Sequence, residues 1–262
     1  VTVNGGAVVA FGSKLNGGNV THDSRCNGYK IPLSSGVSKI TASAGAFAAL
    51  KEDGTVYAWG NTHAGAGVST LTTPALTGVT AVVGSRSAFA ALLSTGAVVV
   101  WGDSYAGGDA SAVQSELTAD IIHVVASNAA FVAFTKSNGL VVWGYPGYGG
   151  DAAAVQHLLN SGVKFVAHTF SAMAAVKFDG SVVTWGKPDC GGDSLAVQAD
   201  LHHIVKVVGN GRAFAALNST GGVVAWGKPS DGGVIPADKA AYLRSGVVSI
   251  HHTDRAIAAL RS

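Results

Sequence analysis

The sequence predicts an all-β fold built from a repeat of about forty residues, a period typical of the blades of a β-propeller. When the repeats are aligned, two features recur at the same positions and set the period. Every tryptophan of the chain is followed by glycine, and a short apolar segment precedes each of these pairs. The tryptophans are Trp59, Trp101, Trp143, Trp185 and Trp226, with Phe11 in the same place 48 residues before Trp59, and the later intervals are 42, 42, 42 and 41 residues. The repeats therefore end near residues 12, 60, 102, 144, 186 and 227.

The upstream apolar segments are predicted to be the middle strands of the blades. They cover residues 46–50, 88–92, 130–134, 172–176, 213–217 and 256–260. Turns such as Asp53-Gly54 and Asp179-Gly180 separate them from the tryptophan strands, because glycine supplies the positive φ of a two-residue hairpin. A further strand precedes each pair, as at 37–40 and 79–83. Successive apolar residues mean that both faces of each sheet are buried, as they are between two neighbouring blades.

The two ends of the chain hold complementary parts of one further repeat. Residues 7–11 form a predicted strand without a hairpin partner, and residues 246–262 hold two strands that stop where the next turn is due. We therefore predict a single propeller domain over 1–262 whose last blade, 246–262 plus 1–12, is closed by strands from both termini. This gives six blades, with seven as the alternative. Residues 13–35 form an insertion.

A glycine-rich link follows each tryptophan strand, for example at 103–109, 145–151 and 187–193. Three of these links end in an aspartate: Asp109, Asp151 and Asp193. The apolar residues that follow recur at i and i+4 and include Leu117, Leu159 and Leu201. An aspartate cap ahead of such a pattern predicts a short helical turn that packs on the blade rim.

Composition narrows the classes of function. Charged residues make up 12% of the chain and hydrophobic residues 48%, and the formal charge is +2 from 17 basic and 15 acidic residues. No basic stripe runs along the sequence, so nucleic acid is not an expected partner. No apolar run approaches the roughly 18 residues of a membrane span, so we do not expect insertion into a membrane.

The cysteines and the glycosylation sequons indicate whether the protein is extracellular or intracellular. Cys26 and Cys190 either pair with each other or are both inert. Asn19 and Asn218 begin Asn-x-Thr triplets and are candidate glycosylation sites. The low charge and the missing initiator methionine add to these sequons in favouring an extracellular or cell-surface setting, with a cytoplasmic or nuclear one as the alternative.

The repeated Gly-x-Val-x-x-Trp-Gly column, the Gly-Gly pairs after it and the Ala-Phe-Ala-Ala-Leu segments resemble the repeats of the regulator of chromosome condensation (RCC1-like) family. The short period is similar to the branch that contains beta-lactamase inhibitory protein. The resemblance covers nearly the whole chain and implies a β-propeller that binds proteins and does no covalent chemistry. Two features depart from the family pattern: six repeats where seven are typical, and a missing histidine before most middle strands.

No catalytic or metal site is predicted. Neighbouring histidines, as in His202-His203 and His251-His252, would point to opposite faces of a strand and could not share an ion. His168 and His252 occupy one repeat position and are expected to approach the same axial region. No nucleophile elbow or dinucleotide fingerprint occurs in a fitting context. We predict no enzyme, no cofactor and no metal.

The predicted contact face lies on the links, where aromatic and basic side chains recur: Tyr105, Tyr145, Tyr148, Lys187 and Lys228. The bends between first and second strands carry Arg86, Arg212 and Arg255, which we expect on the opposite rim, either solvated or paired with an acidic partner.

The first functional hypothesis is a non-enzymatic, extracellular structural or adhesive propeller that assembles with itself as a filament or matrix, or binds another protein or glycans. The alternative is an intracellular protein-binding regulator, such as a small-GTPase exchange factor or an enzyme inhibitor.

Overall fold

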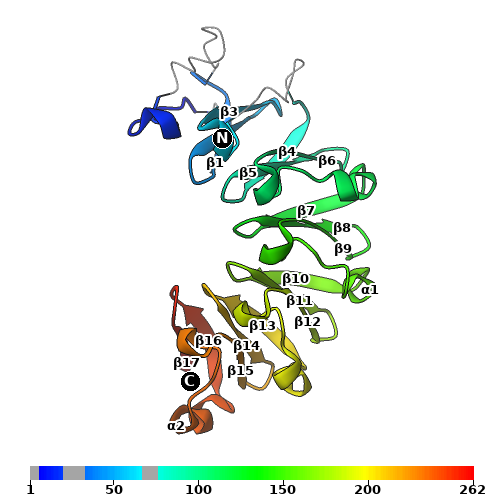
Figure 1. Cartoon of the computed structure of the whole chain (residues 1–262), viewed down its shortest axis with the longest axis vertical. Coiled ribbons are helices and arrows are strands. Elements are labelled where there is room, and N and C mark those ends of the chain that lie inside the picture. The colour runs from blue at the N-terminus through cyan, green and yellow to red at the C-terminus, as the bar shows by residue number, and fades with distance from the viewer. Residues whose placement is uncertain (1–5, 20–32, 67–75) are drawn as a thin grey trace. The chain divides into compact units, whose positions relative to one another are not determined.

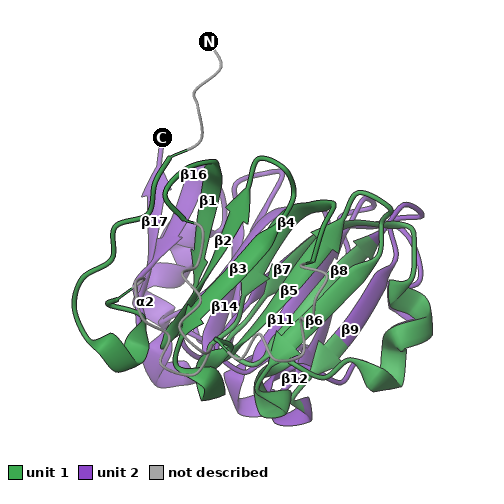
Figure 2. Ribbon diagram, turned by 90° about the horizontal axis from the view of Figure 1, so that it is seen from above, with its two compact units in different colours: residues 1–134, 143–145 green, residues 135–142, 146–262 purple. Residues whose placement is uncertain are grey.

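The computed structural model describes residues 6–19, 33–66 and 76–262. They fall into two compact units, distinguished by colour in Figure 2. Unit 1 holds residues 1–134 and 143–145, and unit 2 holds residues 135–142 and 146–262. Each unit is described by itself, and the assignment of one propeller domain to 1–262 stays a prediction.

The all-β prediction is confirmed. The described residues form five three-stranded antiparallel sheets and one two-stranded sheet, and within each sheet the strands follow chain order (Figure 1). This architecture fits a β-propeller, while the number of blades stays a prediction. The strands are β1 Val37–Ala42, β2 Ala46–Lys51, β3 Val56–Gly60, β4 Val79–Gly84, β5 Ala88–Leu93, β6 Val98–Gly102, β7 Ile121–Ala126, β8 Ala130–Thr135, β9 Leu140–Gly144, β10 Val163–His168, β11 Ala172–Lys177, β12 Val182–Gly186, β13 Ile204–Gly209, β14 Ala213–Asn218, β15 Val223–Gly227, β16 Val247–His252 and β17 Ile257–Arg261.

In the described residues, helical structure lies in the segments before and between the sheets. The predicted helical turns form after the aspartates, and their leucines Leu117, Leu159 and Leu201 are buried. Each aspartate accepts a hydrogen bond from a backbone N–H two residues on, as Asp109 does from Ser111 at 2.8 Å. The helices are α1 Gln156–Leu159 and α2 Ala237–Ala240, with 3-10 turns at Lys14–Asn16, Thr62–Ala64, Ser104–Ala106, Ser111–Leu117, Pro146–Tyr148, Pro188–Cys190, Leu195–Asp200, Pro229–Asp231 and Ala241–Leu243.

The middle strand of each complete sheet forms the core, as its apolar sequence predicts. Ala172 to Val176 of β11 are at most 1% exposed, and both faces of the strand are covered. A phenylalanine of the middle strand stacks on the tryptophan of the third strand in every complete sheet but one, where Met173 of β11 pairs with Trp185. Phe89 and Trp101 have ring centroids 5.4 Å apart, and Phe214 and Trp226 lie 5.1 Å apart. The tryptophan column is therefore part of the core.

The predicted hairpin turns form at one end of each sheet. Gly180 has a φ of 81°, and the Asp179 carboxylate accepts from the Ser181 backbone and hydroxyl at 2.9 and 2.7 Å. These bonds lower the pKa of Asp179, because they favour its ionised form. The Gly180 carbonyl accepts from Ile204 N of the next repeat, so the turn also sets where the following first strand begins.

The predicted strand at 7–11 is not formed in unit 1. Gly6 makes an isolated bridge with Val37, and Val8 N donates to the Leu33 carbonyl at 2.8 Å. Val9 and Phe11 are 86% and 92% exposed. Val8 packs on the core beside Leu33 and Val37, but a strand needs backbone pairing along its whole length, which these bonds do not supply.

Candidate functional site

Bends and links lie at the same end of each sheet. The first residue of each link donates its backbone N–H to a carbonyl in the bend of the same sheet. Examples are Asp103 to Ser87 at 3.0 Å in unit 1 and Lys228 to Arg212 at 3.0 Å in unit 2. The prediction that Arg86, Arg212 and Arg255 lie on the opposite rim is therefore wrong. The reason is parity, because a chain that crosses a sheet three times leaves it at the end where its first bend lies.

Polar side chains just before the middle strands hold bend and link together, namely those of Ser43, Ser85, Thr169 and Asn210. The Ser85 hydroxyl donates to the Ala106 carbonyl at 2.7 Å and accepts from Ala88 N at 3.1 Å. Thr169 makes the same two bonds, to Cys190 O and from Ala172 N, each at 3.0 Å. The sequence analysis missed this column, although Ser43, Ser85, Ser127, Thr169, Asn210 and Thr253 align in it.

The links themselves have a fixed conformation. Each begins and ends at a glycine of positive φ, such as Gly102 at 113° and Gly107 at 92°. A Cβ on Gly107 would lie 2.6 Å from the Phe131 ring, so no other residue fits there. The Gly107 carbonyl accepts from the Trp143 indole N–H at 3.1 Å, and the other tryptophans hold the preceding links at 2.9 to 3.0 Å. Side chains on the links are thus mounted on a rigid base.

We call the exposed side chains of the bends and links in each unit its link surface. In unit 1 this surface carries Tyr105 and Tyr145, two members of the predicted contact face. Their rings are 5.9 Å apart with a tilt of 58°, and they are 72% and 39% exposed. The Asp103 carboxylate fixes the start of the link by accepting from Tyr105 N at 2.8 Å. The structure thus brings these two predicted residues together as an exposed aromatic pair.

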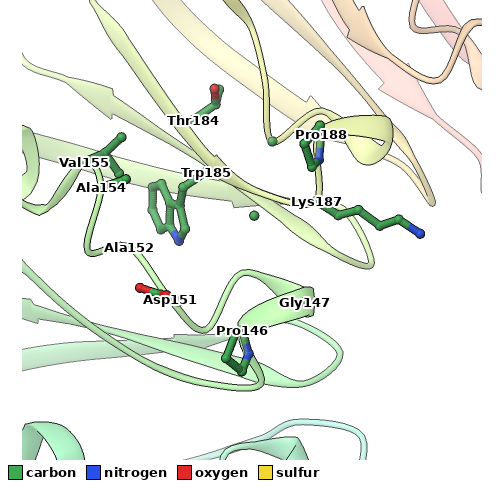
Figure 3. A pocket seen from close by; sticks show the side chains of 12 residues that line it. Pro146, Gly147, Asp151, Ala152, Ala154, Val155, Thr184, Trp185, Lys187 and Pro188 are labelled. Carbon is green, nitrogen blue, oxygen red and sulfur yellow. The ribbon is translucent and has the colours of Figure 1, made fainter.

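In unit 2 the link surface carries the other three predicted residues. Lys187 is exposed, and Tyr148 and Lys228 are half-buried. A groove of about 680 Å³ runs beside β12, between the segments 146–155 and 184–192. Pro146, Pro188 and Thr184 are among the residues that line it, and Lys187 extends outward from its rim (Figure 3). Trp185 is only 4% exposed, so its ring packs beneath the floor of the groove and offers little contact area to a ligand.

His168 and His252 end the first strands β10 and β16, on either side of Gly209 at the end of β13. Partial burial lowers the pKa of His168, and the neighbouring His252 lowers it further. The hydrogen bond between His168 Nδ1 and the Thr169 carbonyl, at 3.2 Å, raises the pKa and so opposes both effects. The electrostatic effect of His252 on His168 agrees with their shared repeat position, while their approach to one axial region stays a prediction.

The other histidine pair differs from its prediction. His202 and His203 lie in the loop before β13, and their rings are 5.3 Å apart, edge to face. Among the described residues, no group of three or more His, Cys, Asp or Glu side chains is placed to hold a metal ion.

Three predicted modification residues are described. Cys190 is a buried free thiol in the core of unit 2, while Cys26 lies outside the described residues, so their pairing stays a prediction. Asn218 ends β14 at a hairpin turn, and its amide oxygen accepts from the Thr220 hydroxyl at 2.9 Å and from Gly222 N at 2.7 Å. Asn19 is half-buried, and the rest of its triplet lies outside the described residues. Glycosylation of either asparagine stays a prediction.

Comparisons with solved structures return β-propellers of low sequence identity. Prp20p, the RCC1 of Saccharomyces cerevisiae, is 14% identical over 73% of this chain and 58% of its own, with a TM-score of 0.43. Human WBSCR16 is 18% identical over 76% and 64%, with a TM-score of 0.47. The CRINKLY ectodomain of the Arabidopsis thaliana receptor kinase ACR4 is 15% identical over 85% and 79%, with a TM-score of 0.49.

This chain spans roughly three fifths of the length of the first two structures. No protein-family model matches the sequence, and no curated protein is similar to it. Membership of the RCC1-like repeat family and of its short-period branch stays a prediction. Within the described ranges, none of the helices has the length and apolar character needed to cross a bilayer.

Proposed function

We propose that this protein is a non-enzymatic β-propeller that binds other proteins through its link surfaces. The observation that carries the proposal is the exposed Tyr105–Tyr145 pair on the rigid links of unit 1. Tyrosine is enriched at the centres of protein interfaces, because its ring offers a large contact area with few torsions to restrict. A pair already packed on a fixed backbone loses little further entropy on binding.

The test compares two variants as bait for the native partner. Tyr105→Ala/Tyr145→Ala removes the aromatic pair, and Phe178→Ala removes a 65% exposed aromatic ring at the hairpin-turn end as a matched control. Mass spectrometry identifies the partner that the wild-type bait retains. We expect the double variant to lose this partner and Phe178→Ala to keep it. Equal retention by all three proteins contradicts the proposal.

We further propose that residues 7–11 are the third strand of a sixth blade begun by β16 and β17. The segment after them already has the conformation of a link: Gly12 has a φ of 115°, against 118° and 113° at Gly60 and Gly102. Gly18 N donates to Ser13 O at 2.8 Å, as Gly108 N does to Asp103 O. Phe11 thus stands where the other links have a tryptophan.

The acceptor in this proposal is the outer edge of β17. Leu260 of β17 is 59% exposed, whereas the corresponding Leu217 of β14, which has a third strand beside it, is 6% exposed. An open, apolar edge strand is a template for pairing with another segment. When the segment comes from the same chain it closes the ring, and when it comes from a neighbour it links copies into a filament or matrix.

An extracellular structural or adhesive role follows from the second arrangement, and the low charge of the sequence supports it. The intracellular regulator is the second candidate, favoured by the burial of Cys190, which is 4% exposed in the core of unit 2. Peptide mass spectrometry of unreduced native protein distinguishes them. Glycans on Asn19 or Asn218, or a Cys26–Cys190 bridge, support the extracellular role. Free thiols with unmodified asparagines support the intracellular one.

A further inference from the structure

Basic side chains gather on the first strands of unit 2 and on the bends that follow them. We call this set the basic face: Lys164, Lys206, Arg212 and Arg255, with His168, His251 and His252. All seven are exposed. The three segments that carry them, 163–171, 204–212 and 247–255, contain one acidic residue, Asp254. The chain as a whole is nearly balanced in charge, so these strands concentrate its positive excess.

Contacts between repeats bring the three segments side by side. β13 contacts both β10 and β16. In the bends, Phe170 N donates to Gly211 O at 3.2 Å, and Gly211 N donates to Asp254 O at 3.0 Å. In the strands, the Lys206 ammonium donates to the Ile250 carbonyl of β16 at 3.1 Å. The cations therefore form one surface that begins at Lys164 and ends at the bends.

These cations have no acidic partners within the part of the chain that the structure describes. None of the four Lys and Arg side chains forms an ion pair there, whereas Lys239 pairs with Asp238 at 2.9 Å. Two carboxylates of unit 2 are engaged elsewhere, since Asp151 and Asp193 accept backbone N–H groups ahead of the helical turns. The basic face is thus unneutralised and available to an external anion.

Apolar side chains are interspersed among the cations. Phe170, Val205 and Val248 are 53%, 46% and 55% exposed. Val205 and Val248 occupy the same position at the bulges of β13 and β16, and Phe170 lies in the bend beside Gly211. Two valines and a single phenylalanine match apolar side chains of a peptide better than the stacked bases of a nucleic acid, which favour a row of aromatic rings.

We propose that the basic face binds an acidic segment of a protein partner, in which Asp or Glu alternates with apolar residues. The proposal rests on the proposed function and names the chemistry of the partner. Six strand residues span about 20 Å, enough for an extended peptide to meet Lys206 midway and Arg212 or Arg255 at the bend. Complementary charges give such a contact its specificity and a fast association rate.

The experiment measures fluorescence anisotropy of a labelled Glu-Leu alternating peptide with the full chain. Arg212→Glu/Arg255→Glu reverses two charges of the basic face, and Lys239→Glu/Arg244→Glu makes the same charge change in the α2 region as the control. We expect the first variant to weaken binding by about tenfold or more at low salt, and the control by less than about twofold, because local charge pairs decide the contact. A Lys-Leu peptide should not bind.

Three results overturn the proposal: equal binding of both peptides, no binding of the acidic peptide at low salt, or wild-type affinity in Arg212→Glu/Arg255→Glu. Displacement by a single-stranded oligonucleotide as effective as by unlabelled peptide also overturns it, in favour of a general polyanion site. This readout, the anisotropy of a labelled peptide, is separate from the retention of the native partner that tests the proposed function. Loss of the native partner with Tyr105→Ala/Tyr145→Ala, but no binding of the acidic peptide, refutes this inference alone.

Discussion

Each tryptophan does two structural jobs, and Trp143 shows both. Its ring stacks on Phe131 at 5.3 Å with a tilt of 13°, and its N–H holds the Gly107 carbonyl at 3.1 Å. Trp143→Ala should lower the free energy of unfolding by about 3–5 kcal/mol, because it removes a buried ring. Trp143→Phe keeps the stack and leaves the carbonyl unpaired, so it should lose only about 1–2 kcal/mol. Urea denaturation measures both losses. Equal losses would show that the stacked ring adds nothing to the hydrogen bond, and no loss in Trp143→Phe would show that the hydrogen bond contributes nothing.

The polar column gives a second prediction at this scale. Ser85 is 6% exposed, so Ser85→Ala leaves the Ala106 carbonyl and the Ala88 N–H without the hydroxyl that bridges them. The expected loss in unfolding free energy is about 1–3 kcal/mol. Ser85→Thr is the control, because Thr169 makes the same bonds in unit 2. A Thr variant as unstable as the Ala variant would mean that packing, and not the hydroxyl, matters at this position.

His168 predicts a pH dependence of stability. Its folded pKa lies below the ordinary value of 6.5, so the unfolded chain takes up this proton more readily. The contribution of His168 to the free energy of unfolding is therefore complete above about pH 6.5. It is lost as the pH falls from there through the folded pKa. His168→Gln should therefore lose less stability than wild type between about pH 7.5 and 5.5. Thermal melts at several pH values test this, and parallel curves for the two proteins would contradict it.

At the scale of elements, the strands could be predicted from sequence and their assembly could not. The alternation of apolar segments and Gly turns places β2, β5, β8, β11 and β14 within a residue or two of where they lie. The prediction for the arginines of the bends was wrong because it did not consider that a chain crosses each sheet three times. The bend and the link must then lie at the same end of the sheet. The Ser, Thr and Asn column was missed since its hydrogen bonds join residues 21 positions apart, which no local pattern reveals.

The distance between neighbouring first strands is also invisible in the sequence. A Cβ on Gly209 of β13 would lie 2.2 Å from the His168 carbonyl of β10. Gly209→Ala must push the two strands apart, and we expect it to lower the unfolding free energy by about 1–3 kcal/mol. Gly6→Ala is the control: its Cβ would meet only Val37 O, at 3.8 Å, and should change stability by less than about 0.5 kcal/mol. Equal effects of both variants in urea denaturation would contradict the close approach.

At the scale of the whole molecule, the open questions are how the repeats close and what covers β17. The sequence predicts complementary ends, and the structure of unit 1 adds that the link 12–18 is formed while Val9 and Phe11 before it are exposed. The column of polar residues before the middle strands offers a check, because Thr253, which is exposed in unit 2, is its sixth member. By the spacing of the other repeats, its hydroxyl would pair with the carbonyl of Asn16 once residues 7–11 join β17.

Phe11 provides the decisive substitution. Its ring is 92% exposed in unit 1, so Phe11→Asp should leave that unit intact and act only where the ring docks. If residues 7–11 complete the sixth blade, burying this carboxylate against β17 should lower the melting temperature of a monomer or dissociate an oligomer. Leu15→Asp is the control, since Leu15 is 72% exposed on the adjoining link and outside the strand.

Sedimentation equilibrium of wild type decides which arrangement holds. A monomeric mass at all concentrations means closure within one chain, and a mass that rises with concentration, and falls to the monomer in Phe11→Asp, means exchange of the strand between copies. In both cases the effect of Phe11→Asp must exceed that of Leu15→Asp. Unchanged mass and melting temperature in Phe11→Asp would show that β17 pairs with something other than residues 7–11.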